Sequence, residues 1–410
     1  MTFEELYTSM LRQNFGKGGP PSEADPEHLA CLLHPERYAP VLKTESCEAC
    51  EYDRACEKSC IFDAIVEEDG EIKIDPARCV GCSACIESCK LGKLTASRDV
   101  FPALRAVREK KGPAYALIAP AFLGQFSDEV TPGKLRSAFA ALGFDGMVEV
   151  ALFADILTFK EAIEFDRNVN QVEDYQLTSC CCPIWIAMIR RSYSELMPHM
   201  PAAVSPMIAC GRVVKKLHPD AVTVFIGPCI AKKSEACEPD IADAVDYVLT
   251  FEEVRDIFEA AEINPALLPD RKREHSSRAG RIYARTGGVS EAVSKTVAQM
   301  RPGRALQVRP RQADGVPACR AMVEEIRAGK GDANFFEGMG CRGGCVGGPK
   351  AILSSAEGRA RVDIYGDEAE AKTPLENPFV PELLERLGFH DVESFLEESD
   401  LFQRDFGEKK

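Results

Sequence analysis

The residues of this chain best suited to chemistry are cysteines set among glycines late in the sequence. Residues 339–349 read Met-Gly-Cys-Arg-Gly-Gly-Cys-Val-Gly-Gly-Pro, which places Cys341 and Cys345 four residues apart. Glycine adopts positive φ values and lets backbone approach a ligand closely. Thiolates with that clearance suit iron–sulfur chemistry better than core packing. A turn that merely holds two buried thiols would leave the upstream cysteine motifs without partners. We therefore predict that this loop forms one wall of a metal site.

Two cysteine runs precede this loop, and their spacing is typical of bacterial ferredoxins. The second run matches that spacing, and the first matches it with three extra residues between its second and third cysteines. In this pattern the fourth cysteine of one run ligates the other cluster. Ile61 and Lys90 stand where a proline usually follows the fourth cysteine. A zinc ribbon would need only four cysteines in two pairs, so it explains the eight poorly. We predict one [4Fe–4S] cluster on Cys47, Cys50, Cys56 and Cys89, and another on Cys79, Cys82, Cys85 and Cys60.

The composition limits the kinds of function that are possible. The 410 residues include 18 cysteines and only six histidines, and the formal net charge is −15. Clustered cysteines in a reducing compartment indicate metal rather than disulfides. The negative charge argues against nucleic acid or an anionic membrane as the main partner. No apolar run reaches the roughly 18–20 residues that span a bilayer. The acidic, amphipathic start does not look like a targeting signal, so we expect a cytoplasmic protein.

Elements of two kinds are expected to position these cysteines. Residues 61–74 look like a hairpin with Asp69 and Gly70 in its turn. Farther on, the apolar runs 115–120 and 222–226 fit buried parallel strands, and helices are expected over 134–142 and 159–165. Strands that alternate with helices predict an α/β architecture with partly parallel sheets, in which ligands gather at the carboxyl ends of strands.

The remaining cysteines divide into isolated residues and motifs. Cys31, Cys210, Cys237 and Cys319 stand alone and are most simply core thiols. The motifs are Thr-Ser-Cys-Cys-Cys-Pro-Ile-Trp at 178–185, Gly-Pro-Cys-Ile-Ala-Lys-Lys-Ser-Glu at 227–235, and the glycine loop. One thiolate from each of the first two and two from the third supply the four that a [4Fe–4S] cluster needs. The segment 285–290, Arg-Thr-Gly-Gly-Val-Ser, fits equally well a plain helix start or a backbone approach to a cluster.

At these three motifs the chain resembles the [FeFe]-hydrogenases, the iron-only hydrogenases. Their signatures are Thr-Ser-Cys-Cys-Pro-x-Trp, Pro-Cys-x-x-Lys-x-x-Glu and Met-x-Cys-x-x-Gly-Cys, in that order, and this chain matches all three with one change in the first. The likeness covers roughly residues 41–355. It implies an α/β catalytic domain with two lobes of partly parallel sheet around the active-site cluster, preceded by an α+β domain like bacterial ferredoxin. The implied divisions are 1–40, an N-terminal helical extension; 41–95, the ferredoxin-like domain; 96–112, a linker helix; 113–355, the catalytic domain; and 356–410, an acidic helical surface cap.

The resemblance also implies an H-cluster, a [4Fe–4S] cluster joined to a two-iron subsite that carries CO, cyanide and an azadithiolate. Lys232 matches the lysine that hydrogen-bonds a cyanide, a charge-assisted contact in a dry pocket. Met339 matches the methionine that packs on the subsite, and Pro120 and Pro228 fall in loops expected to border it. The implied ligands are Cys182, Cys229, Cys341 and Cys345, the last of which also bridges to the subsite.

The implied reaction is the reversible reduction of two protons by two electrons to dihydrogen. Electrons would come from ferredoxin or a similar low-potential carrier through the two ferredoxin-type clusters, and maturation proteins would install the two-iron unit. Cys181 matches the proton-relay thiol of the family. Glu161 and Glu164 match its two relay glutamates, and their spacing of three places them on one helix face. Without the resemblance, a solvated acidic face would be the favoured interpretation of this pair.

The chain departs from the family pattern mainly around the two-iron subsite. Pro201 falls where the relay has a serine, and proline offers neither a hydroxyl nor a backbone N–H. Gly227 replaces a methionine, Met207 a glutamine and Ala121 a serine, and Cys180 is an extra thiol. We therefore predict a divergent hydrogenase with an altered proton relay. The alternatives are a hydrogen-sensing hydrogenase of low turnover and a relative of the cytosolic iron–sulfur assembly factor, which lacks the subsite.

Overall fold

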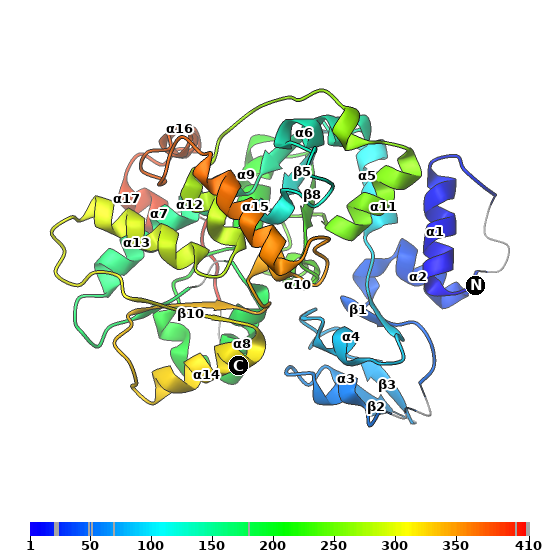
Figure 1. The fold of residues 1–410 in the computed structure, drawn as a ribbon, viewed down its shortest axis with the longest axis horizontal. Coiled ribbons are helices and arrows are strands. Elements are labelled where there is room, and N and C mark those ends of the chain that lie inside the picture. Colours follow the sequence, from blue (N-terminus) through cyan, green and yellow to red (C-terminus); the bar gives the residue numbers. More distant parts are fainter. Residues whose placement is uncertain are drawn as a thin grey trace.

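The computed structural model of the protein describes residues 1–19, 24–47, 50, 52–68, 70–178, 181–397 and 400–406. A large α/β body holds two parallel sheets, and a small cysteine-rich unit lies at one end of it beside the N-terminal helices (Figure 1). Those N-terminal helices are α1, Phe3–Asn14, and α2, Pro26–Leu33, followed by the 3₁₀ turn η1, Pro35–Arg37. Within the described residues, no helix has the length and apolar character needed to cross a membrane.

The first sheet of the body has four parallel strands in the order β6-β5-β8-β9. The central strands β5, Ala114–Ile118, and β8, Val222–Gly227, are the two that the apolar runs predict, and their side chains are almost all buried. Parallel strands need crossover connections, which helices provide here. The other elements are β6, Gly146–Glu149; β9, Tyr247–Thr250; α6, Pro132–Ala141; α7, Ala151–Asn168; α9, Pro206–Leu217; α10, Ala231–Ala236; and α11, Phe251–Ala261.

The second sheet has three parallel strands in the order β10-β11-β7. Its middle strand β11, Phe335–Met339, is buried at every position and ends at the glycine loop. The short strand β7, Gln176–Leu177, ends just before the first cysteine motif of the body. Two strands of this sheet therefore deliver cysteine motifs at the same edge, as β8 does in the first sheet. The accompanying elements are β10, Pro310–Asp314; α8, Pro183–Ser192; α12, Arg278–Arg281; α13, Gly288–Met300; and α14, Val316–Arg327.

The cysteine-rich unit consists of two antiparallel strand pairs and two short helices. The predicted hairpin is present, with Glu68 opposite Glu71, although Asp69 of its turn lies outside the described residues. The outer strands of the unit also pair with each other, which brings its two ends together. The elements are β1, Val41–Lys43; α3, Ala55–Lys58; β2, Ile65–Glu68; β3, Glu71–Ile74; α4, Ala84–Ser88; and β4, Leu94–Ala96.

Two segments differ from the sequence-based expectation. The linker helix α5, Val100–Glu109, has six buried residues, so it packs into the core instead of forming a solvated connector. The C-terminal segment is not only a surface cap, because Phe395 and Phe402 are buried and Phe395 stacks on Phe159 of α7. In α5, apolar side chains spaced for one helix face outweigh the charged residues between them. The C-terminal helices are α15, Ser355–Asp367; α16, Phe379–Arg386; and α17, Val392–Glu397.

Among the described residues, five short 3₁₀ turns complete the body. They are η2, Pro120–Phe122; η3, Ser194–His199; η4, Pro265–Leu267; η5, Ile282–Ala284; and η6, Cys345–Gly347. Two of them, η2 and η6, contain residues predicted to belong to the site. A 3₁₀ turn suits such positions because it reverses the chain within a few residues at the end of a strand.

Candidate metal centres and active site

The three cysteine motifs of the body meet at one buried cavity of about 70 Å³. Cys182 reaches it from the residue before α8, and Cys229 from the loop after β8. The glycine loop after β11 supplies the other two thiols. Every site residue predicted for the body, apart from the two glutamates, lines this cavity: Pro120, Cys181, Cys182, Pro228, Cys229, Lys232, Met339, Cys341 and Cys345. Residues far apart in the sequence thus form a single site.

The loop fits its position only because its glycines have no side chains. Gly343 and Gly344 have φ values of +81° and +86°, which side-chain-bearing residues rarely adopt. A Cβ atom on Gly344 would lie 2.7 Å from the backbone nitrogen of Thr286. The backbone N–H of Gly340 also donates to the sulfur of Cys182, 3.2 Å away. The loop is therefore a cradle in which backbone, not side chains, borders the thiols.

The segment that presses on this loop is the one containing Arg285 and Thr286. Thr286 donates its backbone N–H to the carbonyl of Gly343 at 3.0 Å. Asp314 joins the two segments, since it accepts from the hydroxyl of Thr286 at 2.9 Å and from the N–H of Gly343 at 3.0 Å. Helix α13 begins directly afterwards at Gly288. The segment is thus a helix start, one of the two alternatives that the sequence left open, and its Thr286 also contacts the backbone of the cysteine loop. An approach of the glycine pair to a cluster stays a prediction.

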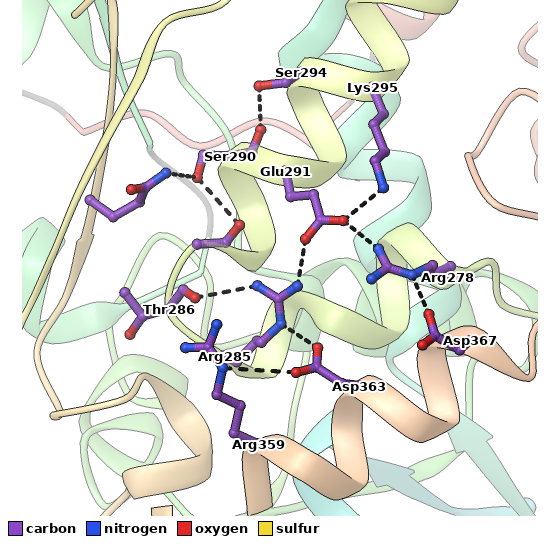
Figure 2. A network of polar contacts seen from close by, with 12 residues as sticks. Arg278, Arg285, Thr286, Ser290, Glu291, Ser294, Lys295, Arg359, Asp363 and Asp367 are labelled. Carbon is purple, nitrogen blue, oxygen red and sulfur yellow. Dashed lines mark hydrogen bonds and ion pairs between the residues drawn. The ribbon is translucent and has the colours of Figure 1, made fainter. Parts of the chain in front are cut away.

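A network of ion pairs holds the segment that contains Arg285 and Thr286 in place (Figure 2). Glu291 of α13 lies between Arg278 and Arg285, and Arg285 also binds Asp363 of α15. Although burial alone would raise it, hydrogen bonds from Lys295, Arg285 and Arg278 lower the pKa of Glu291 to about 2. Glu291 is therefore a carboxylate throughout the physiological range, and it holds the arginine next to the cysteine loop.

The donor set of the cavity fits an iron–sulfur cluster. Burial raises the pKa of Cys182 to about 12, and it raises those of Cys229, Cys341 and Cys345 above the ordinary value as well. Four thiols gathered around one apolar space stay neutral unless a metal supplies positive charge, and such a set suits zinc or an iron–sulfur cluster. The residues present therefore fit the [4Fe–4S] part of the group that the family resemblance implies.

Lys232 is the cation of the cavity and is almost wholly buried. Its ammonium donates to Glu235 at 2.6 Å, one helical turn along α10. Burial alone would lower the pKa of Lys232, but the Glu235 carboxylate raises it above the ordinary value. The lysine is thus charged, and its three donors leave capacity for an anionic ligand in the cavity. This arrangement fits the cyanide contact that the resemblance implies, although the sequence did not suggest the pairing with Glu235.

The eight cysteines of the small unit surround two further cavities. One, of about 20 Å³, is lined by Cys47, Cys50, Cys56 and Cys89, and the other, of about 10 Å³, by Cys60, Cys79, Cys82 and Cys85. We call these the outer cage and the inner cage, and we call the cavity of the body the central cage. Each set is the one that the exchange of the fourth cysteine predicts, so Cys60 and Cys89 do lie with the other run.

The inner cage touches the helix that follows one of the central thiols. Gly81 of the inner cage packs so closely on α10 that a Cβ atom there would lie 3.1 Å from the backbone of Ala231. The hydroxyl of Ser234, also on α10, donates to the carbonyl of Cys79 at 3.3 Å. Because α10 begins two residues after Cys229, only a short stretch of backbone lies between the contact with the inner cage and this thiol of the central cage.

The predicted relay carboxylates lie on α7, outside the lining of the central cage. Glu161 is fully buried, and Glu164 forms an ion pair with Lys160, which is also buried. Burial raises the pKa of Glu164 above its ordinary value. The sequence gives no sign of a role for Lys160, because a lysine beside two glutamates looks like part of a solvated face. Pro201 follows η3, and its carbonyl accepts the N–H of Ala203 at 2.9 Å.

Some of the positions at which the chain departs from the family pattern line the cavity, and others lie outside its lining. Ala121 and Met207 line the central cage. Gly227 does not line it, and a Cβ atom on Gly227 would lie 2.9 Å from the ring of Phe225, which does. Cys180 lies outside the described residues. Tyr283 of η5 also lines the cavity, and no sequence motif marks it. Among the isolated cysteines, Cys31, Cys210 and Cys319 are buried as predicted, but Cys237 is exposed because it ends the short helix α10 at the surface.

Parallel α/β sheets whose strand ends gather four thiols around an apolar cavity define an iron–sulfur protein of the α/β class. Residues 113–349 match the family described as iron only hydrogenase large subunit, C-terminal domain, and the chain belongs to this family. One similar relative is the periplasmic [Fe] hydrogenase large subunit of Nitratidesulfovibrio vulgaris, 27% identical over 69% of this chain and 86% of the relative. Another is the cytosolic iron-sulfur assembly component 3 of Bos taurus, 25% identical over 78% of this chain and 80% of the relative. The [FeFe]-hydrogenase HydA1 of Chlamydomonas reinhardtii shares the fold, with a TM-score of 0.62 and 23% identity over 75% of this chain and 98% of that structure.

Proposed function

We propose that this protein is an iron-only hydrogenase that interconverts H2 with two protons and two electrons. The observation that carries the proposal is that Cys181 and Lys232 line the same cavity as the four clustered thiols. A cage that only stored or passed on a [4Fe–4S] cluster would need the four thiols alone. A further thiol and a buried ammonium at the cavity wall are suited to a proton-handling reaction beside an anionic group.

In this proposal the central cage holds the H-cluster, which supplies the reduction of protons and the splitting of H2 when it is bound. Cys182, Cys229, Cys341 and Cys345 would be its ligands. Lys232 would donate hydrogen bonds to an anionic ligand of the subsite while Glu235 keeps the ammonium charged and oriented. The apolar lining around Met339 excludes water, which strengthens these contacts.

The chain also offers a route for electrons. Gly81 and Cys79 of the inner cage contact α10, whereas a Cβ atom on Gly70 of the outer cage would meet no described atom within 4 Å. We infer that electrons pass from the outer cage to the inner cage and then to the central cage. The donor would be ferredoxin or a similar low-potential carrier. The described cysteines are all free thiols, the state that cluster ligation requires, which fits a reducing compartment such as the cytoplasm.

The experiment that tests the proposal is maturation of the protein with the maturation enzymes of this family, followed by infrared spectroscopy. Bands from CO and cyanide together with H2 evolution from reduced viologen are expected. Cluster absorbance without those bands would contradict the proposal and favour an iron–sulfur assembly role. That second candidate is supported by the similarity to the assembly component of Bos taurus over most of both chains. Bands with H2-dependent spectral changes but negligible turnover would instead favour a hydrogen sensor.

A further inference from the structure

Three buried polar atoms between α7 and β7 have no hydrogen-bond partner among the described residues. They are Oε1 of Gln176, Oγ1 of Thr178 and Oε2 of Glu164. Gln176 is 2% exposed and Thr178 is fully buried. An unsatisfied buried polar group costs about 1–3 kcal/mol, so native proteins pair nearly all of them, with ordered water where no protein group is near. Three such atoms in one region therefore point to something bound there.

The side chains of Gln176 and Thr178 are directed toward α7, which carries the predicted relay carboxylates. The amide nitrogen of Gln176 donates to the backbone carbonyl of Glu161 at 3.4 Å, so the side chain of Gln176 points toward α7. Side chains two apart on a strand point to the same side, and the N–H of Thr178 continues the ladder to Phe336 at 2.9 Å. Thr178 is therefore directed to the same side as Gln176. Glu164 lies one helical turn beyond Glu161 on α7.

Water fits this set of groups. A buried water usually has two to four polar partners, and a carbonyl oxygen, a hydroxyl and a carboxylate oxygen together meet that requirement. The hydroxyl is the important member, because it can accept a proton on one side while it donates another. Pro201, at the position of the relay serine, has no hydroxyl to offer. The Thr178 hydroxyl thus provides the kind of group that the chain has lost at position 201.

We propose that ordered water, bound by Thr178 and Gln176 between β7 and α7, connects Glu161 with Glu164 and replaces the missing serine in the proton route. The inference rests on the proposed function for its role, but not for the presence of the water. A proton that leaves one carboxyl passes to the water–hydroxyl chain, which releases a different proton to the other carboxylate, so no net charge stays behind. Gln176 positions the water, and the ammonium of Lys160 holds Glu164 in place.

The first test is structural and does not depend on activity. A crystal structure of the cluster-loaded protein at a resolution that shows water should reveal at least one ordered water within hydrogen-bond distance of both Thr178 and one of the two glutamates. Thr178→Val should remove that water, and the infrared carboxyl bands should shift. A dry interface in the wild-type protein would overturn the proposal.

The second test measures turnover in the maturated protein. Thr178→Val should reduce H2 evolution about tenfold or more, with a larger solvent isotope effect, while the CO and cyanide bands stay unchanged. Thr178→Ser keeps the hydroxyl and should restore most of the rate. Thr296→Val is the matched control, because Thr296 is equally buried but bonds the carbonyl of Ala292 in its own helix. Equal rates for the two valine variants would contradict the relay role.

The two tests also separate the inference from the proposed function. If the wild-type protein shows no CO or cyanide bands, the hydrogenase assignment fails, and the crystallographic search for the water still decides whether the site exists. If the bands are present and the water is absent, the hydrogenase assignment stands and this inference fails.

Discussion

The outer and inner cages and the central cage hold four cysteines each, but the chain builds them in opposite ways. All eight thiols of the small unit come from residues 47–89, within two runs of similar spacing. The four thiols of the central cage come from three loops spread over residues 182–345 and from strands of two different sheets. The first construction is local and repeats a motif, whereas the second depends on the whole body being folded.

This difference extends to the groups around the thiols. The small cavities are lined by cysteines, glycine and apolar residues, with one serine, two lysines and an arginine. The central cavity adds a buried lysine, a further thiol and a glycine loop that is held from outside by Asp314 and Thr286. Such supports orient and tune a metal site, and losing one typically costs 10–100-fold in metal affinity or activity, as a rough guide. Under the proposed function, this difference corresponds to electron transfer by the small cages and chemistry at the central cage.

The largest effect is expected from breaking the central cage alone. Cys345→Ser should abolish H2 evolution, a loss of more than about 1,000-fold, because the residue is proposed to touch the reacting group. The signals of the two small clusters in electron paramagnetic resonance should persist. Cys319→Ser is the matched control, since Cys319 is a buried thiol that does not line the cage and bonds the carbonyls of Ala313 and Met339. Loss of all clusters in Cys345→Ser would show that the cages are not independent.

The next effect separates the proton-handling thiol from the ligands. Cys181→Ala should lower turnover roughly 100-fold or more, the usual contribution of a positioned acid–base group. Iron content and the CO and cyanide bands should match the wild-type protein, because Cys181 is not one of the four proposed ligands. Unchanged turnover would mean that protons reach the central cage by another route.

The fourth cysteine of each run lies in the cage of the other run, so mutating it should remove the cluster of that other cage. Cys60→Ala should remove the cluster of the inner cage, and Cys89→Ala that of the outer cage, each with about a third of the [4Fe–4S] iron. Both variants should keep the central cluster, and both should lose most of the H2 evolution driven by a protein electron donor. If Cys60→Ala removed the cluster on Cys47, Cys50 and Cys56 instead, the assignment of cysteines to cages would be wrong.

The same contrast explains how far the sequence could predict the structure. Spacing alone placed Cys60 and Cys89 in exchanged cages, because a local motif carries its own geometry. The three motifs together indicated a four-thiolate central cage, but only the resemblance to a family said that Cys182, not Cys180 or Cys181, supplies the first thiolate. Neither source indicated Lys160, Asp314 or Tyr283, since these residues meet their partners through tertiary packing and carry no pattern of their own. The exposed Cys237 was missed for a related reason: an isolated cysteine gives no sign of whether its helix continues into the core.

The smallest effect concerns the support behind the central cage, which the small cages lack. Glu291 has a pKa of about 2 in the folded protein, below the ordinary value of a glutamate near 4.3. A lowered pKa stabilises the fold fully above the ordinary pKa, and this contribution is lost as the pH falls from there through the folded value. With Glu291 partly exposed, the contribution at neutral pH should be about 2 kcal/mol.

Glu291→Gln should therefore lower the free energy of unfolding by about 2 kcal/mol at neutral pH, measured by urea denaturation. The difference from the wild-type protein should shrink as the pH is lowered below about 4, where the wild-type carboxylate also takes up a proton. Glu259→Gln, at an exposed helical position, should change stability by less than about 0.5 kcal/mol. Because Arg285 and Thr286 press on the glycine loop, Glu291→Gln should also lose its central cluster sooner on mild acidification than its two small clusters. Equal rates of loss for all three clusters would mean that the network in Figure 2 stabilises the body without supporting the cage.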